Sequence, residues 1–114
     1  MERQLRLRRD ADFARLRREG RAYHSRWMVL SVATNGLTHN RYGFVTSKQV
    51  GNAVQRNRVR RLLREAIRAL HPALHSGYDI VLVARQSLAQ EPYSAVLRIV
   101  GSQIQQAGLV MQDR

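Results

Sequence analysis

The most regular pattern of hydrophobic and polar positions lies in the middle of the chain. Its apolar residues recur at the three- and four-residue spacing of one helix face: Val59, Leu62, Leu63, Ala66, Ile67 and Leu70. Asn52, which follows a glycine, suits the N-cap of such a helix. Pro72 requires the helix to end before it, because the residue preceding a proline avoids the helical conformation. The pattern therefore predicts an amphipathic helix between Asn52 and Pro72.

A shorter helical pattern lies near the N-terminus. We expect a helix that contains Phe13, with Asp10 or Asp12 as its N-cap and Gly20 at the C′ position beyond its last turn. Before this helix, the alternation of leucine and arginine over residues 5–8 is typical of an extended arm with one basic face.

A third helix is expected near the C-terminus. Pro92 is predicted to be its first residue, because proline needs no hydrogen-bond partner for a backbone N–H in the first turn. The expected buried stripe of this helix consists of Tyr93, Val96, Leu97, Val100, Ile104 and Ala107.

The strand patterns fall in segments 27–33, 41–46 and 78–85. In the second of these, Tyr42 and Phe44 point to one face, and Gly43 and Val45 to the other. In the third, the continuous apolar run 80–84 predicts a strand that is buried on both faces. The order of elements is helix, strands, helix, strand, helix, which predicts helices packed on one sheet in a two-layer α/β sandwich.

The charge balance is unusual for a chain of 114 residues. Twenty basic residues oppose eight acidic ones, which gives a formal net charge of +12, and every basic residue except Lys48 is an arginine. A positive field of this strength attracts a polyanionic partner. The guanidinium group also donates paired hydrogen bonds to phosphate and stacks on bases. The composition therefore favours a nucleic acid as the partner.

The arginines are concentrated on the central helix, at Arg56, Arg58, Arg60, Arg61, Arg64 and Arg68, and only Glu65 opposes them there. Arginines four residues apart on a helix repel each other by roughly 0.2–0.5 kcal/mol per pair, and a polyanion would relieve that repulsion. Asn57 lies among them and can bind a base or ribose edge. A solvated polar face is the simpler interpretation, but such faces usually mix lysine, arginine and glutamate. No helix-turn-helix partner precedes the helix, so we expect no binding to DNA.

Several other classes of protein are not supported by the sequence. The chain has no cysteine, and therefore no disulfide and no thiolate metal site. The longest purely apolar run, 80–84, is far too short to span a bilayer. The arginine-rich N-terminus lacks the apolar segment of a secretory signal. We expect a cytoplasmic protein that does not bind membranes.

A self-contained nuclease is the main alternative from a different functional class. Such an enzyme needs carboxylates that converge on Mg²⁺, but the acidic residues of this chain are scattered along it. Asp10 and Asp12 form the one close pair, and helix capping explains them. His71 and His75 have the spacing of helical metal ligands, but Pro72 interrupts the helix between them. We therefore expect no catalytic residue and no metal site on this chain.

The segment 51–66, Gly-Asn-Ala-Val-Gln-Arg-Asn-Arg-Val-Arg-Arg-Leu-Leu-Arg-Glu-Ala, resembles the Arg-Asn-Arg signature of the bacterial ribonuclease P protein component. The lead-in 43–48 is similar to the strand that precedes this signature in the family. Shorter matches occur at 12–13 with Gly20, and in segment 78–85. The resemblance covers nearly the whole chain, and the long arginine block is the part that is highly specific.

The resemblance implies a small α/β (α+β) sandwich with a mixed sheet of four strands and three helices in the order α-β-β-β-α-β-α. It also implies a left-handed β-α-β crossover at the basic helix, whereas general rules favour a right-handed one in about 98% of parallel crossovers. We expect one RNA-binding domain over residues 1–114, with flexibility confined to an arm (1–9) and a tail (108–114).

In this family the protein pairs with a large catalytic RNA, and the complex hydrolyses a phosphodiester bond in precursor tRNA to release the 5′ leader. The RNA and its Mg²⁺ carry the chemistry, while the protein binds the leader and lowers the metal requirement. The resemblance thus implies a subunit of a ribonucleoprotein endonuclease that holds no cofactor itself. Its implied partners are the catalytic RNA and precursor tRNA.

By position, the resemblance assigns the surface that faces the catalytic RNA to Asn52, Arg56, Asn57, Arg58, Arg60, Arg61, Arg64 and Arg68. Phe13 matches an aromatic residue of a cleft that contacts the leader. Arg6, Ser47 and Lys48 are expected as further groove or phosphate contacts.

Two positions of the expected cleft depart from the family pattern. Many relatives have a second aromatic residue where this chain has Arg17, and a sheet position that often holds tyrosine is Ser31 here. Each lost stacking contact removes about 1–3 kcal/mol per base. Because the cleft has fewer aromatic residues, we expect leader binding to depend less on stacking and more on charge.

One alternative within RNA binding stays open at this point. The composition fits a general or ribosome-associated RNA-binding protein equally well, and only the arginine block argues against it. No aromatic signature of an RRM and no GxxG loop of a KH domain is present.

Overall fold

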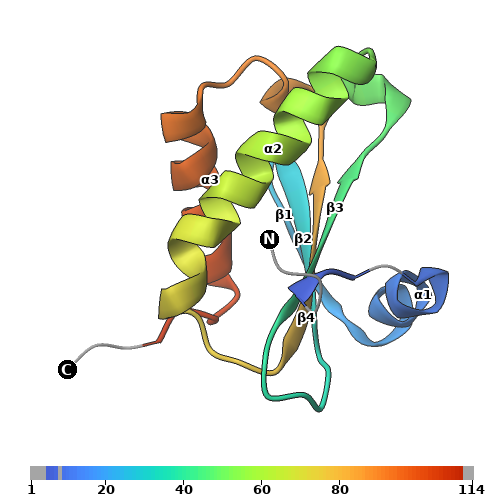
Figure 1. The fold of residues 1–114 in the computed structure, drawn as a ribbon, viewed down its shortest axis with the longest axis vertical. Helices are drawn as coiled ribbons and strands as arrows, with labels where there is room; N and C mark the ends of the chain where they lie inside the picture. The colour runs from blue at the N-terminus through green and yellow to red at the C-terminus, as the bar shows by residue number, and fades with distance from the viewer. Residues whose placement is uncertain (1–4, 8, 112–114) are drawn as a thin grey trace.

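The computed structural model describes residues 5–7 and 9–111. Within them lie α1 (Asp10–Glu19), β1 (Arg21–His24), β2 (Met28–Thr34), β3 (Arg41–Thr46), α2 (Ala53–Leu70), β4 (Tyr78–Ala84) and α3 (Tyr93–Gln106) (Figure 1). Short 3₁₀ turns follow β3 (η2, Lys48–Val50), α2 (η3, His71–Ala73) and β4 (η4, Gln86–Leu88). Three helices and four strands in this order confirm the predicted fold class.

The strands form one mixed sheet in the order β1-β2-β4-β3. β2 is antiparallel to both of its neighbours, whereas β3 and β4 are parallel. α2 is therefore the crossover between the two parallel strands. In Figure 1 both strands run upward, α2 lies in front of them, and β4 lies to the left of β3, which makes the crossover left-handed as expected.

α2 and α3 cover one face of the sheet, which we call the helix face (Figure 1). The fully buried side chains of this core are Met28, Leu30, Tyr42, Val59, Leu63, Ala66, Ile67, Ile80, Leu82, Leu88, Val96, Val100 and Ile104. Most of the predicted α2 stripe is in this set, while Leu62 and Leu70 pack at its margin. Burial of this apolar surface is the main force that holds α2 in place.

The opposite side of the sheet, which we call the open face, is covered only in part. α1 and the segment 5–7 form a smaller apolar cluster on it with Ala33 and Val81. The backbone N–H of Leu7 donates to the carbonyl of Tyr42 at 2.8 Å, so this segment pairs with the outer edge of β3. Val81 on this face and Leu82 on the other are both buried, which confirms that β4 is buried on both faces.

The predicted capping of α1 is wrong at both ends. The N-cap is Arg9, so Asp10 and Asp12 lie inside the first turn and neither caps the helix. Gly20 is the C-cap in an extended conformation, with φ −81°. It is a glycine because a Cβ there would lie 2.6 Å from the carbonyl oxygen of Leu16, and not because of a left-handed turn.

The start of α3 also differs from the prediction. Pro92 is the N-cap and not the first helical residue. Tyr93, predicted to be buried, is 37% exposed, and its hydroxyl donates to the carbonyl of Glu65. Ala95 takes a buried position that the predicted stripe did not include.

Candidate nucleic-acid interface

The basic helix α2 begins with a reciprocal cap. The side chain of Asn52 accepts a hydrogen bond from the backbone N–H of Gln55, and the Gln55 side chain accepts one from the backbone N–H of Asn52, both at 2.9 Å. This capping box satisfies two backbone donors that have no partner within the helix. It confirms the predicted cap and fixes where the arginine run starts.

The eight residues predicted to face the catalytic RNA do not share one environment. The exposed ones are Asn52, Asn57, Arg61, Arg64 and Arg68, and the partly buried ones are Arg56, Arg58 and Arg60. Within the described part of the chain, the side chains of Arg56 and Arg61 have no hydrogen bond or ion pair. Arg68 forms an exposed ion pair with Glu65 at 3.6 Å. That is the only carboxylate paired with an α2 arginine among the described residues, so the basic face is not neutralised internally.

Arg60 and Arg64 are oriented toward β3. Arg60 donates to the Thr46 hydroxyl at 2.6 Å and to the side-chain oxygen of Asn57. The guanidinium carbon of Arg64 lies 5.9 Å from the centre of the Phe44 ring, within the range of a cation–π contact. These contacts hold two cations at the junction of α2 with the edge strand β3. The two side chains therefore lose less conformational entropy when they bind a phosphate.

Arg58 points back into the protein. Its guanidinium donates to the backbone carbonyls of Ala89 at 3.0 Å and Glu91 at 3.1 Å. It thereby closes the loop that enters α3. The sequence could not distinguish this arginine from its neighbours, because the loop it holds lies about 30 residues later in the chain.

We therefore expect Arg58→Met to act mainly on stability. Losing two hydrogen bonds from a charged group to partly buried carbonyls lowers the free energy of unfolding by about 2 kcal/mol. Urea unfolding followed by circular dichroism measures this change. The control Arg61→Met removes an exposed arginine of the same helix and should change stability by less than about 0.5 kcal/mol. Equal losses in the two variants would contradict a structural role specific to Arg58.

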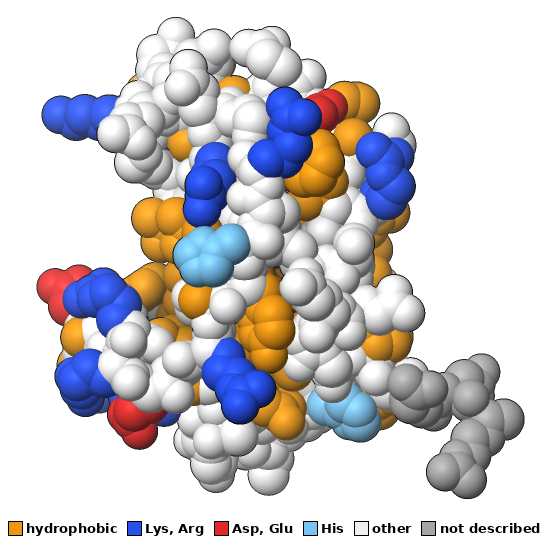
Figure 2. All heavy atoms as spheres, turned by 180° about the vertical axis from the view of Figure 1, so that it is seen from behind, with side chains coloured by type: hydrophobic (Ala, Val, Ile, Leu, Met, Phe, Trp, Pro, Cys, Tyr) orange, Lys and Arg blue, Asp and Glu red, His pale blue; other side chains and the backbone are white. Residues whose placement is uncertain are grey.

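A hollow of about 170 Å³ lies on the open face, lined by Phe13, Leu16, Arg17, Ser31, Val45, Val81 and Val83. Seen from behind, the molecule is hollowed between α1 and the segment that joins β3 to α2, and hydrophobic side chains are exposed there (Figure 2). The structure thus brings together Phe13, Arg17 and Ser31, which were assigned to leader binding. We call this feature the groove.

The other three residues assigned to the leader do not line the groove. Ser47 and Lys48 are exposed and directly follow β3, one strand residue of which, Val45, does line it. Arg6 is exposed and bridges to Tyr42 at the outer edge of β3. All three therefore flank β3 at its end or edge, between the groove and the arginines of α2.

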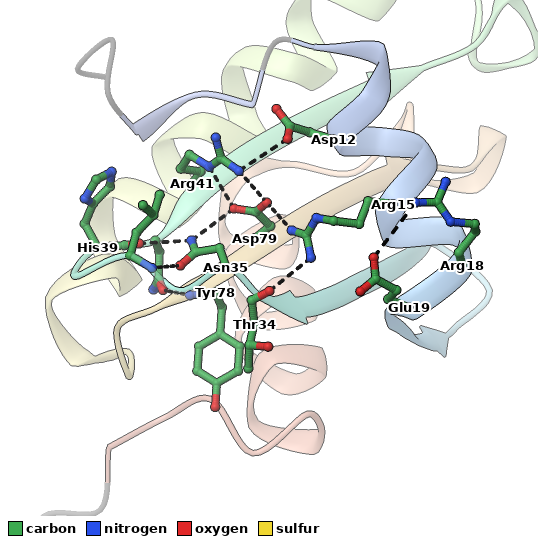
Figure 3. A network of polar contacts seen from close by, with 12 residues as sticks. Asp12, Arg15, Arg18, Glu19, Thr34, Asn35, His39, Arg41, Tyr78 and Asp79 are labelled. Atoms are coloured by element: carbon green, nitrogen blue, oxygen red, sulfur yellow. Dashed lines mark hydrogen bonds and ion pairs between the residues drawn. The ribbon is translucent and has the colours of Figure 1, made fainter.

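A buried carboxylate next to the groove was not predicted as a functional residue. Asp79 on β4 is fully buried and accepts hydrogen bonds from Arg41 at 2.9 and 2.8 Å, from Arg15 at 2.6 Å and from Asn35 at 3.0 Å (Figure 3). Asp12 adds a longer contact to Arg41 at 3.4 Å. We call these five residues the Asp79 cluster. An aspartate inside an otherwise apolar strand is the sequence signal that marks it.

The cluster shifts the acidities of its members. Burial raises the pKa of the Asp79 carboxyl, but the hydrogen bonds from Arg41, Asn35 and Arg15 lower it by more, so its pKa lies below the ordinary value. The hydrogen bond to Asp79 raises the pKa of the Arg41 guanidinium. The carboxylate and its arginines therefore stay charged at neutral pH and hold α1, β3 and β4 together.

The described residues, 5–7 and 9–111, contain no group of three or more histidine, aspartate or glutamate side chains that could hold a metal ion. No helix among them is both long and apolar enough to cross a membrane.

Comparison with known proteins gives one consistent family. The profile of the family described as Ribonuclease P matches residues 1–108. A ribonuclease P protein component from Chloroflexus aurantiacus is 43% identical over 111 residues, covering 96% of this chain and 82% of that protein. One from Roseiflexus sp. (strain RS-1) is 40% identical over 111 residues, covering 96% and 91%.

Solved structures agree with the sequence relatives. The RNase P protein of Staphylococcus aureus aligns with a TM-score of 0.87 at 27% identity, covering 94% of this chain and 98% of that one. The RNase P protein from Thermotoga maritima aligns with a TM-score of 0.79 at 27% identity, covering 88% and 96%. The matched family profile, over residues 1–108, includes α1, the sheet and α2, and so both surfaces described above.

Proposed function

The chain belongs to the ribonuclease P protein family, and from this premise we propose that it is the RNA-binding subunit of a ribonucleoprotein that removes the 5′ leader of precursor tRNA. In this proposal the arginine face of α2 binds the catalytic RNA. The groove binds the single-stranded leader, and the RNA subunit cleaves the phosphodiester bond. The family itself implies ribonuclease P activity as part of a complex and a role in tRNA processing.

The observation that carries the proposal is the basic face of α2. The guanidinium groups of Arg56 and Arg61 have no partner among the described residues, and that of Arg64 packs on the Phe44 ring. When such cations neutralise phosphates, the RNA releases its condensed counterions, and this release drives association. The helix is held to the core by its apolar stripe, and its capping box stabilises its first turn, so it presents these cations on a rigid element.

The groove supports the second part of the proposal. It combines one aromatic ring, Phe13, with aliphatic walls and the guanidinium group of Arg17. A base can stack on the ring while the cation binds a backbone phosphate. β3 borders the groove on one side and the arginines of α2 on the other. In this proposal, one strand therefore connects the surface for the substrate with the surface for the RNA subunit.

We also propose that the Mg²⁺ used in cleavage is bound by the RNA. Support comes from three acidic side chains in the described part of the chain that form ion pairs with arginine. Asp79 and Asp12 pair with arginines of the cluster, and Glu65 pairs with Arg68. Carboxylates that are already paired with arginine are poor ligands for a divalent cation, which requires anionic oxygens free to coordinate it.

Phe13→Ala is expected to weaken binding of precursor tRNA about tenfold, because one base loses a stacking partner worth roughly 1–3 kcal/mol. Binding of mature tRNA, which has no leader, should not change. Equilibrium binding of both RNAs to the assembled complex measures the difference. Tyr93→Ala, which removes an exposed aromatic side chain from α3, is the control and should leave both affinities unchanged. Equal weakening of both RNAs by Phe13→Ala would refute the leader role of the groove.

Reconstituted cleavage tests the proposal as a whole. Purified protein, the catalytic RNA of the same organism and precursor tRNA are mixed at a low Mg²⁺ concentration. We expect cleavage at the 5′ end only when protein and RNA are both present. Cleavage by the protein alone would establish a protein-borne nuclease and overturn the proposal. Cleavage that does not depend on the protein would support the alternative of a general RNA-binding protein.

A further inference from the structure

The helix α1 is attached to the open face with little apolar burial. Leu16 is its only buried residue, and Phe13 is partly exposed because it lines the groove. Only a small apolar area therefore fixes where the helix lies on the sheet, since hydrophobic stabilisation is proportional to the area removed from water. Something else must hold the side chains of α1 at a defined place over the groove.

The Asp79 cluster supplies that attachment. Arg15 of α1 donates to the Asp79 carboxylate on β4 at 2.6 Å and to the carbonyl of Thr34 on β2 at 3.1 Å. The same carboxylate is held from the other side by Arg41 on β3 through two hydrogen bonds (Figure 3). Through one side chain, α1 is thus linked to β2 and β4 directly and to β3 through the carboxylate.

A second contact fixes the ring of Phe13. A Cβ placed on Gly43 would lie 2.8 Å from one ring carbon of Phe13 and 2.9 Å from another. The ring therefore rests directly on the backbone of β3, in space that only glycine leaves open. Gly43 is paired with Val81, and the next row along the same face pairs Arg41 with Asp79, so the two contacts lie in adjacent rows of the sheet.

We propose that Arg15 and Gly43 are positioning residues that set the place of the Phe13 ring in the groove and thereby the affinity for the single-stranded 5′ leader. This inference rests on the proposed function of the groove. Arg15 lies two residues after Phe13 and two before Arg17. Arg15, which is bound to Asp79, therefore lies between the two groove residues Phe13 and Arg17 on α1. It fixes the height of their side chains above the sheet.

The physical reason is that stacking needs a preorganised ring. A ring held at a fixed place presents its face to a base without losing further conformational freedom on binding. If Arg15 no longer binds Asp79, α1 shifts or fluctuates on its small apolar contact, and the leader must order it. If Gly43 gains a methyl group, the ring must leave the β3 backbone, since atoms at 2.8 Å overlap.

The test measures how well the assembled complex discriminates precursor tRNA from mature tRNA. In Arg15→Met we expect the affinity for precursor tRNA to fall about tenfold, with the affinity for mature tRNA and for the catalytic RNA unchanged. Gly43→Ala should give a loss in the same direction without any change of charge. The matched control is Arg18→Met, which removes an exposed arginine of the same helix whose ion pair with Glu19 spans 4.0 Å. It should leave the discrimination intact.

A conservative variant separates positioning from folding. Arg15→Lys keeps a cation that can reach Asp79, and it should restore at least half of the lost discrimination on a logarithmic scale. Circular dichroism verifies that each variant is folded at the assay temperature. If Arg15→Met does not fold, Arg15→Lys and Gly43→Ala still decide the matter, since both are expected to fold.

The outcomes are distinct from those of the proposed function. If the wild-type complex does not discriminate precursor from mature tRNA, the groove is not a leader site, and both proposals fail. If the wild type discriminates and Gly43→Ala leaves this discrimination unchanged, the positioning role is overturned while the proposed function stands. Equal losses of affinity for both RNAs in Arg15→Met would also overturn it, because they would show a general defect.

Discussion

Replacing Arg56, Arg61 and Arg64 together by glutamine should weaken assembly with the catalytic RNA by roughly two orders of magnitude at about 0.1 M salt. Each phosphate contact adds about 0.7–0.9 to the slope of log affinity against log salt concentration. Three lost contacts should therefore reduce the slope by between two and three units. Filter binding or fluorescence titration over a range of salt concentrations measures the affinity and the slope together.

The matched control removes the same charge from elsewhere on the surface. Arg21, Arg26 and Arg98 are exposed and lie outside α2. Their replacement by glutamine lowers the net charge from +12 to +9, as the first triple variant does. If the general field of the protein drove assembly, both variants would weaken it equally, and that result would contradict a defined interface on α2.

Asp79→Asn should lower the free energy of unfolding by roughly 3 kcal/mol at neutral pH. The change removes the charged partner of Arg15 and Arg41, and breaking one side of a buried ion pair typically costs 3–5 kcal/mol. We expect the lower end because both arginines are about a quarter exposed, at 26% and 25% of their side-chain surface, and solvent screens them. Urea unfolding measures the loss. Asp12→Asn, which weakens only one contact of 3.4 Å, is the control and should cost much less.

The same variant predicts a dependence of stability on pH. The folded protein holds the pKa of Asp79 below its ordinary value, so the unfolded chain binds the proton more readily. The stabilisation is therefore complete above the unfolded pKa of about 3.9 and is lost as the pH falls through the lower pKa of the folded state. The groups that face the carboxylate are Arg15, Arg41 and Asn35.

The difference in stability between wild type and Asp79→Asn should consequently be constant from pH 7 to about pH 5 and shrink below about pH 4. Chemical unfolding at a series of pH values measures it. A difference that grows on acidification would contradict the lowered pKa and the charged state of the cluster.

The elements with strong periodicity were predictable from the sequence, and those held by distant contacts were not. α2 was located through its apolar spacing and its capping residue, and the structure places both as predicted. β1 was not located, because three of its four residues are exposed and it carries no alternating pattern. Its place is set by pairing with β2, which is a tertiary contact.

The roles of single arginines were also beyond the sequence. Arg58 and Arg61 are alike in a helical pattern, yet one closes the loop before α3 and the other is exposed. In the same way, Asp12 suggested a helix cap, but its carboxylate faces Arg41 on β3. Both assignments depend on which strand or loop packs nearby, and periodicity contains no information about that.

The groove shows what the resemblance to a family added. The pattern alone places Phe13 in a short helix and Ser31 in a strand, and it gives neither residue a role. The structure places them with Arg17 in one hollow because α1 leaves part of the open face uncovered. The pairing of β4 with β2 and β3 determines which side chains line it, and this pairing joins strands that are far apart in the chain.

Cross-linking from α2 tests most directly whether its arginine face contacts the catalytic RNA. A photoreactive side chain is introduced in place of Arg61 in one protein and in place of Arg98 in another, and each is assembled with the RNA and irradiated. We predict a covalent adduct with the catalytic RNA from position 61 and little or none from position 98. An adduct from position 98 with none from position 61 would show that the RNA binds elsewhere and would contradict the account.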